Sequence, residues 1–486
     1  MVLSLLASSD FAPHVQVAPH AKEAAITQTK PLSQHIEQAE EKMATADTPL
    51  AAVVIVGGGP VGLLLALMLA QKGIRSAVLE KDEALNKSPR AVAFSGPVHH
   101  VFQEVGIYDT ILQDAAQTPG FCWRKVAEDD GRGGKRLGEK VAEWRLGEPN
   151  EAGVYNPGDY VLQYPQDKIG QMLLDRCLET SLVTFHFGTE LYAIDESKGG
   201  VSARAKSKKG NLEVRGQYLV GCDGGRSVVR RLMGVKMFGP SWSERFMTTD
   251  IVRTPPVVEE VNIDYIVNPD YWAITTPLER ATPGKRTLWR YSMAITNDDI
   301  PDDEAIKPGF VNEMLLKHLD GPRPADFEVL RVNLYRMHQL LASTMFRNRL
   351  LLAGDAAHLT NPIGGLGLCT GMLDADALAQ AFDLALNRYA CEPKVQEECF
   401  RAYSAARRRV FQTVVHPMSS ACKTRLQCGN PDEIAEEDWY MRTLRNGNKS
   451  EIDKMHDGLI NHWRTNLAVE LMNIKEPARN TVLSQL

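Results

Sequence analysis

The chain has 486 residues, and its 55 lysine and arginine residues against 61 aspartate and glutamate residues give a formal net charge of −6 at pH 7. This balance provides no basic field to attract nucleic acid or an anionic membrane, so we expect neither partner. The length allows two to three domains' worth of core, although large α/β enzymes often fold as one interwoven unit.

The eight cysteines are scattered and form no C-x-x-C pair. We therefore expect no metal site and no redox pair, but free thiols in a reducing compartment. No apolar run reaches the 18 or so residues of a membrane span. Residues 1–48 are predicted to be a flexible leader with a poor secretory signal. A cytoplasmic protein is expected, with organelle targeting by the leader as the alternative.

Residues 51–82 have the pattern of a complete βαβ nucleotide-binding unit. The apolar run Ala51–Val56 is typical of a buried strand, and a leucine-rich helix follows a G-x-G-x-x-G turn. The first glycine permits the tight turn, the second lets a pyrophosphate approach the backbone, and the third lets the helix pack on the sheet. We predict that a dinucleotide, most simply FAD, is bound here by Gly57, Gly59, Pro60, Val61 and Gly62.

An acidic residue ends the second strand of this unit. The strand is predicted over Ser76–Leu79, and Glu80 follows it about 20 residues past the glycines. A carboxylate at this position accepts hydrogen bonds from a ribose diol and repels a 2′-phosphate. Glu80, with the adjacent Lys81, therefore predicts FAD or NAD rather than NADP in this pocket.

The remaining chain predicts an interrupted nucleotide-binding domain. Residues 239–341 read as strand segments between turns, which indicates an inserted antiparallel sheet that faces the substrate. A buried strand returns at 349–353. The fold class is therefore α/β, and the segments are a leader (1–48), the first part of a Rossmann-like domain (49–238), a substrate-binding β-sheet domain (239–341), the closing part of the first domain (342–385) and a C-terminal helical cover (386–486).

Two further motifs follow strands. Residues 218–234 contain a D-G turn at Asp223 and Gly224, with Arg226 beside it and Ser227 placed to cap a helix. Taken alone, this stretch could be an ordinary strand-to-helix turn.

The other motif lies in residues 349–376, where a strand ends at Gly354 and Asp355 and a glycine-rich loop leads to a helix expected to begin near Leu368. A carboxylate there can hold a polyol chain, and glycines let a flat ring lie on the backbone. The helix N-terminus would stabilise an anion such as reduced flavin. A chance glycine-rich loop is the alternative, but three motifs in this order are unlikely to occur together by accident.

With these motifs the chain resembles the single-component FAD-dependent aromatic hydroxylases, a family similar to para-hydroxybenzoate hydroxylase and the phenol hydroxylases, over residues 51–382. The resemblance implies a glutathione-reductase-type FAD-binding fold. It implies that Asp223 and Arg226 serve FAD and the nicotinamide cofactor, and that Asp355, after Gly354, holds the ribityl chain. Further flavin contacts are implied for Arg90, Gln166 (with Gln163 as the alternative), Pro362, Gly365, Gly367, Leu368 and Cys369, the last standing where relatives often carry Asn.

The resemblance also implies the chemistry. NADPH or NADH reduces FAD, O₂ adds to the reduced flavin, and the flavin C4a-hydroperoxide delivers one oxygen atom to an electron-rich substrate, a phenol or another aromatic, secondary metabolites included. His338 is our candidate catalytic residue near the ring, and a structural histidine is the alternative. Arg290, Tyr291 and Tyr271 could line the pocket or belong to the core. A monomer or homodimer is expected.

Three other functions deserve comparison. A Baeyer–Villiger or epoxidising monooxygenase could use the same scaffold. A flavin-dependent halogenase is disfavoured because YWAITTP lacks the second Trp and the lysine of the halogenase signature. A non-catalytic protein of the Rab-escort type would keep the glycine fingerprint, but it has no need of Asp355 or of the loop that follows.

Overall fold

The computed structural model describes residues 51–87, 90–461 and 463–475. The chain divides into two compact units, Met1–Pro49 and Leu50–Leu486. The leader predicted over residues 1–48 lies outside the described residues, and the following account concerns the second unit. In the part of the chain that the structure describes, every helix is too short or too polar to cross a bilayer.

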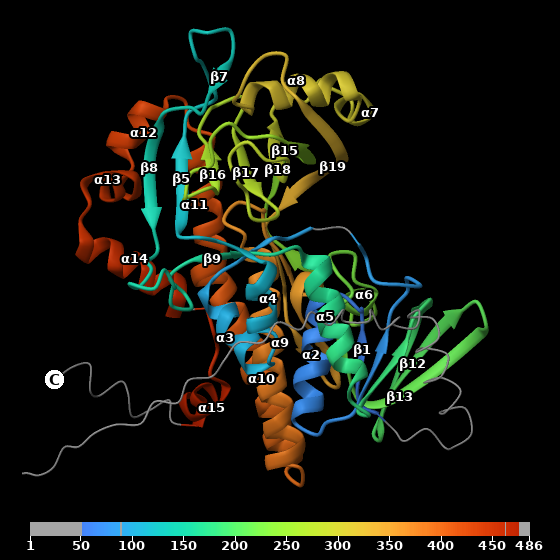
Figure 1. Ribbon diagram of the computed structural model, residues 1–486. Helices are drawn as coiled ribbons and strands as arrows, with labels where there is room; N and C mark the ends of the chain where they lie inside the picture. The colour runs from blue at the N-terminus through green and yellow to red at the C-terminus, as the bar shows by residue number, and fades with distance from the viewer. Residues whose placement is uncertain (1–50, 88–89, 462, 476–486) are drawn as a thin grey trace, which may run out of the picture. The chain divides into compact units, whose positions relative to one another are not determined.

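An eight-stranded sheet carries the nucleotide-binding motifs (Figure 1). Its strands run in the order β10-β2-β1-β13-β12-β11, and β22 pairs in parallel with β13 before β21 pairs with β22. A segment from far downstream therefore completes the sheet. The strands are β1 (Ala51–Val56), β2 (Ser76–Leu79), β10 (Val183–His186), β11 (Thr189–Ser197), β12 (Gly200–Ser207), β13 (Gly210–Gly221), β21 (Phe346–Arg347) and β22 (Leu350–Leu352).

The first helix after the glycine turn is buried on almost every side. α2 (Pro60–Gln71) begins with a proline, whose missing N–H costs nothing at a helix start. It packs against α5 (Gln166–Leu178) and α9 (Leu366–Phe382). Nine of its residues are buried, which explains why its sequence is apolar all round rather than amphipathic.

A seven-stranded sheet lies above the first in Figure 1, in the order β19-β15-β18-β17-β16-β5-β8. The predicted insert, residues 239–341, supplies five of these strands, but β5 and β8 come from earlier in the chain. The strands of the insert pair with one another antiparallel, as expected, whereas β16 pairs in parallel with β5 from outside the insert. The strands are β5 (Gly120–Arg124), β8 (Lys140–Arg145), β15 (Ser241–Arg253), β16 (Asp264–Ile266), β17 (Ala273–Pro277), β18 (Thr287–Ile295) and β19 (Phe327–His338).

The two faces of this sheet pack against different cores. One face, which we call the outer face, forms a separate hydrophobic cluster with α8 (Pro308–His318) and includes Trp289 and Tyr291. The other, the inner face, carries Phe246, Tyr265 and Trp272 and joins the core of the nucleotide-binding sheet. Because side chains alternate along a strand, neighbouring residues of one strand serve different cores.

Small sheets and helices connect these layers. The small sheets contain β3 (Ala93–Phe94), β4 (Ala116–Thr118), β6 (Glu128–Asp129), β7 (Lys135–Arg136), β9 (Val161–Gln163), β14 (Met237–Phe238), β20 (Leu340–Ala342) and β23 (His358–Leu359). The shorter helices are α3 (Gly96–Glu104), α4 (Tyr108–Asp114), α6 (Val228–Leu232) and α7 (Asp302–Ala305), with the single turn η1 (Gly354–Ala356).

The described residues after 386 are mainly helical, and α12 and α13 lie beside β8 (Figure 1). These elements are η2 (Asp383–Arg388), α10 (Pro393–Val410), η3 (Phe411–Val415), α11 (His416–Leu426), α12 (Pro431–Glu437), α13 (Trp439–Asn446), α14 (Lys449–Asn461) and α15 (Leu467–Lys475).

Candidate functional site

The glycine turn between β1 and α2 is shaped by two close backbone contacts. Gly57 has φ of +110°, and a Cβ there would lie 2.4 Å from the carbonyl oxygen of Cys222. A Cβ on Gly62 would lie 2.1 Å from the carbonyl oxygen of Gly57. At Gly59 an added Cβ would meet no atom within 4 Å. Packing thus requires glycine at positions 57 and 62, whereas Gly59 leaves the backbone at the start of α2 open to a ligand.

Glu80 supports this turn from the end of β2. Its carboxylate accepts hydrogen bonds from the backbone N–H groups of Gly58, at 2.6 Å, and Asp82, at 2.9 Å. Each oxygen keeps a lone pair for a second donor. Glu80 can therefore order the turn and bind a ribose hydroxyl together, while Lys81 beside it is exposed.

The D-G motif caps α6 rather than presenting two free side chains. Asp223 accepts hydrogen bonds from Ser227 Oγ at 2.5 Å and from the N–H groups of Val228 and Val229 at 2.6 and 3.1 Å. Ser227 in turn accepts from the N–H of Arg230, as predicted for a helix cap.

Two arginines of this motif have different surroundings. Arg230 donates to the carbonyl oxygens of Gly225, at 2.7 Å, and Ala356, at 2.9 Å, so it joins the D-G loop to the G-D loop. Arg226 is exposed and forms no hydrogen bond or ion pair with any described residue. Arg230, and not Arg226, therefore forms the hydrogen bonds that join these two loops.

The G-D motif lies at the end of β22. Gly354 has φ of +63° and packs against Val61, whose side chain would be 3.1 Å from an added Cβ. The Asp355 side chain is exposed and receives no hydrogen bond from a described residue. Burial nevertheless raises its pKa, against the lowering effects of His358 and Arg90. This carboxylate is open to solvent and has no hydrogen-bond donor from a described residue, so a polyol could bind to it.

A buried charged cluster fixes the backbone beside Asp355. Asp374 of α9 accepts hydrogen bonds from the Gly354 N–H at 2.9 Å, His358 Nε2 at 2.6 Å and Arg407 Nε at 2.7 Å. Burial raises the pKa of Asp374, but the combined lowering by His358 and Arg407 is larger, so the pKa lies below its ordinary value. His358 thus helps to orient Asp374 beside this loop.

The glycine-rich loop after β23 is held by a residue that the sequence analysis missed. Gln339, which is 1% exposed, accepts through Oε1 from the Thr360 hydroxyl and from both the N–H and the side-chain amide of Asn361. Asn361 then accepts from the N–H of Ile363. The only sequence signal was its place beside His338, and a lone glutamine is rarely informative.

The loop leads into α9, which begins at Leu366 rather than near Leu368. Gly365 has φ of +67° and is the residue before the first helical turn, while Pro362, Gly367 and Leu368 are half-buried. Cys369 is buried, its thiol lies 3.6 Å from the carbonyl oxygen of Ala93, and burial raises its pKa. The free N–H groups of this helix start are available to a flavin carbonyl.

His338 lies at the end of β19, where its Nδ1 is 2.7 Å from Ser241 Oγ. It is half-buried. The catalytic role of His338 stays a prediction.

The two glutamines that the sequence could not separate have distinct positions. Gln166 accepts from the N–H of Ala91, next to Arg90, at 3.2 Å. Gln163 is buried and donates to Thr276 Oγ1 of β17 at 2.6 Å, which leaves its Oε1 without a partner. Gln166 therefore belongs to the crossover segment and Gln163 to the inner face of the seven-stranded sheet.

That inner face also contacts the crossover segment directly. Arg290 of β18 donates to the carbonyl oxygen of Arg90 and forms an ion pair with Asp250 of β15 at 2.8 Å. The side chain of Arg90 is exposed. The Tyr265 side chain of β16 lies close to the backbone of Gly364 in the glycine-rich loop. Tyr291, by contrast, points to the outer face and accepts from Arg253.

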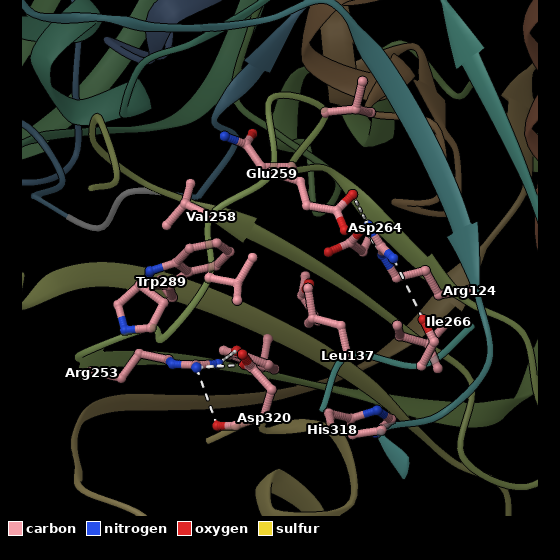
Figure 2. A pocket seen from close by; sticks show the side chains of 18 of the residues that line it. Arg124, Leu137, Arg253, Val258, Glu259, Asp264, Ile266, Trp289, His318 and Asp320 are labelled. Atoms are coloured by element: carbon pink, nitrogen blue, oxygen red, sulfur yellow. Dashed lines mark hydrogen bonds and ion pairs between the residues drawn. The ribbon is translucent and has the colours of Figure 1, made fainter. Parts of the chain in front are cut away.

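A cavity of about 20 Å³ lies on the outer face of the seven-stranded sheet (Figure 2). Charged pairs line it: Arg124 contacts Asp264 at 2.7 Å and Glu259 at 2.5 Å, and Arg253 contacts Asp320 at 2.5 Å. His318 has no hydrogen-bond partner for either ring nitrogen, and burial lowers its pKa to about 3. The volume suits a water molecule, not an aromatic substrate.

Asp264 in this cavity gives a pH-dependent prediction. Burial raises its pKa from 3.8 to about 6, although Arg124 lowers it. Between these values the folded protein holds a proton that the unfolded chain has lost, so stability should fall as the pH rises. Compared with Asp264→Asn, the wild-type free energy of unfolding should drop by about 2 kcal/mol between pH 4 and 6. Urea unfolding of both proteins across this range tests it, and a constant difference would contradict it.

Taken together, the nucleotide-binding sheet presents groups that could contact an adenine dinucleotide. Gly59 leaves the start of α2 open to a pyrophosphate, Glu80 can accept from a ribose, and Asp355 is an unpaired carboxylate placed for a polyol. The geometry fits FAD. Within the described residues we find no cluster of three His, Cys, Asp or Glu side chains that could bind a metal ion, and the eight cysteines are free.

Comparisons with known proteins agree with this geometry. A family model described as FAD binding domain matches residues 50–417. Para-nitrophenol 4-monooxygenase of Pseudomonas sp. (strain WBC-3) is 31% identical over 387 residues, which cover 79% of this chain and 90% of the relative. 6-Hydroxy-3-succinoylpyridine 3-monooxygenase of Pseudomonas putida (strain DSM 28022 / S16) is 30% identical over 417 residues, 84% of this chain and 96% of the relative.

Among solved structures, p-nitrophenol 4-monooxygenase PnpA from Pseudomonas putida DLL-E4 aligns with a TM-score of 0.69 and 28% identity. The alignment covers 88% of this chain and 98% of that chain.

Proposed function

We propose, from the premise that this chain belongs to the family of FAD-dependent aromatic monooxygenases, that it hydroxylates a phenolic substrate with O₂ and a nicotinamide cofactor as electron donor. The predictions of FAD as cofactor and of a monooxygenase are confirmed by the family match and the relatives. The observation that best supports the finer proposal is the inner face of the seven-stranded sheet, which meets both the crossover segment and the glycine-rich loop through Arg290 and Tyr265.

Bound FAD would supply the activation of oxygen, and the chain's residues bind and orient the reactants. The cofactor would be held by the glycine turn, Glu80 and Asp355. The N-terminus of α9 would lie near the developing negative charge of the reduced ring, where its free N–H groups are stabilising. Aromatic side chains of the inner face would keep water from the reacting ring.

His338 remains our candidate for a polar contact to the substrate, acting with Ser241. A histidine paired with a hydroxyl can accept a proton from a phenol if the phenol comes within hydrogen-bond distance. His338→Gln keeps a hydrogen-bonding side chain but cannot take up that proton.

The proposal is tested by adding phenols to purified protein that contains FAD. We expect yellow protein, oxidation of NADH or NADPH that a phenol stimulates, and a hydroxylated product in near-equal amount to the nicotinamide oxidised. Colourless protein that takes up no FAD would instead favour a binding protein of the Rab-escort type. Lactone or epoxide products would favour the Baeyer–Villiger or epoxidising alternative.

Arg226 provides a sharper test of the nicotinamide step. Because Arg226 is exposed and lacks a partner among the described residues, Arg226→Ala should fold and keep FAD. If its charge attracts NADH or NADPH, flavin reduction at low nicotinamide concentration should slow about tenfold, which corresponds to one contact of about 1.4 kcal/mol. Stopped-flow absorbance measures this rate.

Arg230→Ala is the matched control, because Arg230 joins the two motif loops. It should lower the melting temperature and the FAD content together. A normal reduction rate in Arg226→Ala would remove this residue from the nicotinamide site.

A further inference from the structure

We infer that this enzyme selects aromatic substrates that carry no carboxylate. The inference rests on the proposed hydroxylase function and specifies the substrate class of the same site. It follows from the pairing of the buried lysine and arginine side chains with carboxylates. An ionised carboxylate loses several kcal/mol when it leaves water for a protein interior, unless a cation is available to pair with it.

Every lysine and arginine that is buried among the described residues already has a carboxylate partner, at 2.5–3.0 Å. Two of these cations, Arg290 and Lys423, lie on the side of the seven-stranded sheet that faces the glycine-rich loop. Their neutralisation therefore bears on which substituents a substrate held between this face and the loop can carry.

All three guanidinium nitrogens of Arg290 already donate hydrogen bonds within the protein. Its Nε and Nη2 contact the carboxylate of Asp250 at 2.8 and 3.1 Å, and its Nη1 donates to the carbonyl oxygen of Arg90. Arg331 shares Asp250 at 3.4 Å, but its side chain is 37% exposed, so water already solvates that charge.

Lys423 is occupied as well. Its ammonium donates to Glu244 at 2.7 Å and to Gln427 at 2.5 Å, and it lies 4.2 Å from the centre of the Trp242 ring. Although burial raises the pKa of Glu244, the contact with Lys423 outweighs this effect and the pKa is lowered overall, so the pair stays ionised.

Several buried polar atoms on this side have no hydrogen-bond partner among the described residues, and they are neutral. They include Oε1 of Gln163, Nε2 of Gln339 and the Nε1 atoms of Trp242 and Trp272. Gln163 bonds the inner face through Thr276, Gln339 holds the glycine-rich loop, and Trp272 stacks on Phe246 at 5.3 Å. One acceptor and uncharged donors suit hydroxyl, carbonyl, amide or nitro groups better than a carboxylate.

The first test compares matched substrates. We would titrate the enzyme with 4-hydroxybenzoate and its methyl ester, and with 3-(3-hydroxyphenyl)propionate and its methyl ester, following flavin absorbance and nicotinamide oxidation. At least one ester should bind and stimulate oxidation, and each ester should bind at least tenfold more tightly than its acid. Turnover with the acid preferred would overturn this inference alone. No response to any phenol would overturn the proposed function, and this inference with it.

The second test removes the carboxylate that neutralises a buried cation. Asp250→Asn removes the carboxylate beside Arg290 and should shift the acid-to-ester affinity ratio at least tenfold towards the acid. Asp264→Asn is the matched control, because it removes a buried carboxylate beside an arginine, Arg124, on the outer face (Figure 2) and should leave the ratio unchanged. If Asp250→Asn does not retain FAD, Glu244→Gln uncovers Lys423 instead. An unchanged ratio in a folded, FAD-containing variant of either kind would contradict the inference.

Discussion

Asp355→Ala should lose most of its FAD during gel filtration. The Asp355 carboxylate is accessible and unpaired among the described residues, so its hydrogen-bonding capacity is available to the cofactor. Two charge-assisted bonds of about 1.5–3 kcal/mol each would raise the FAD dissociation constant roughly 100-fold to 10,000-fold. Flavin absorbance relative to protein absorbance measures the loss.

Asp355→Asn separates charge from shape in this experiment. The amide keeps one acceptor, so its FAD affinity should lie between those of the wild type and the alanine variant. The variants should unfold at similar urea concentrations without FAD, because the Asp355 side chain forms no hydrogen bond or ion pair with a described residue. Full flavin occupancy in Asp355→Ala would contradict the assignment of this carboxylate to the ribityl chain.

Asp374→Ala should cause the largest loss of stability. Asp374 is fully buried and is the shared partner of Arg407, His358 and the Gly354 N–H. Removing one member of a buried ion pair leaves the other charge without compensation, at a cost of about 3–5 kcal/mol. Urea unfolding should show this loss. FAD affinity should fall with it, because the backbone beside Asp355 loses its anchor.

Asp376→Ala, two residues further along α9, is the control. Asp376 pairs with Arg464, whose side chain is 31% exposed and can be hydrated once its partner is gone. We expect a loss of about 1 kcal/mol. Equal losses in the two variants would mean that the buried cluster has no special role.

The elements that local patterns define were predictable from the sequence. The strands Ala51–Val56 and Ser76–Leu79, on either side of the glycine turn and its helix, have the predicted bounds. Each combines an apolar period with a clear start or stop signal, so neighbouring residues carry the information.

What failed depended on contacts between distant residues. β5 and β8 are short and polar at their ends, and nothing local shows that they join strands from residues 241–338. Gln339 was missed for the same reason, since its importance arises from three hydrogen bonds to a loop about 20 residues away. The sequence also could not tell Arg226 from Arg230, because both follow the D-G motif and only packing distinguishes them.

The pairing of β22 with β13 has a consequence for how the protein is made. The glycine turn emerges from the ribosome early, but the strand that carries Gly354 and Asp355 follows some 290 residues later, after the entire seven-stranded sheet. A sheet with such long-range strand pairing forms slowly, because the chain loses loop-closure entropy before the contacts between the distant segments stabilise it. The nascent chain therefore cannot assemble its FAD site until Asp355 has been synthesised, and cofactor uptake becomes a late marker of correct folding.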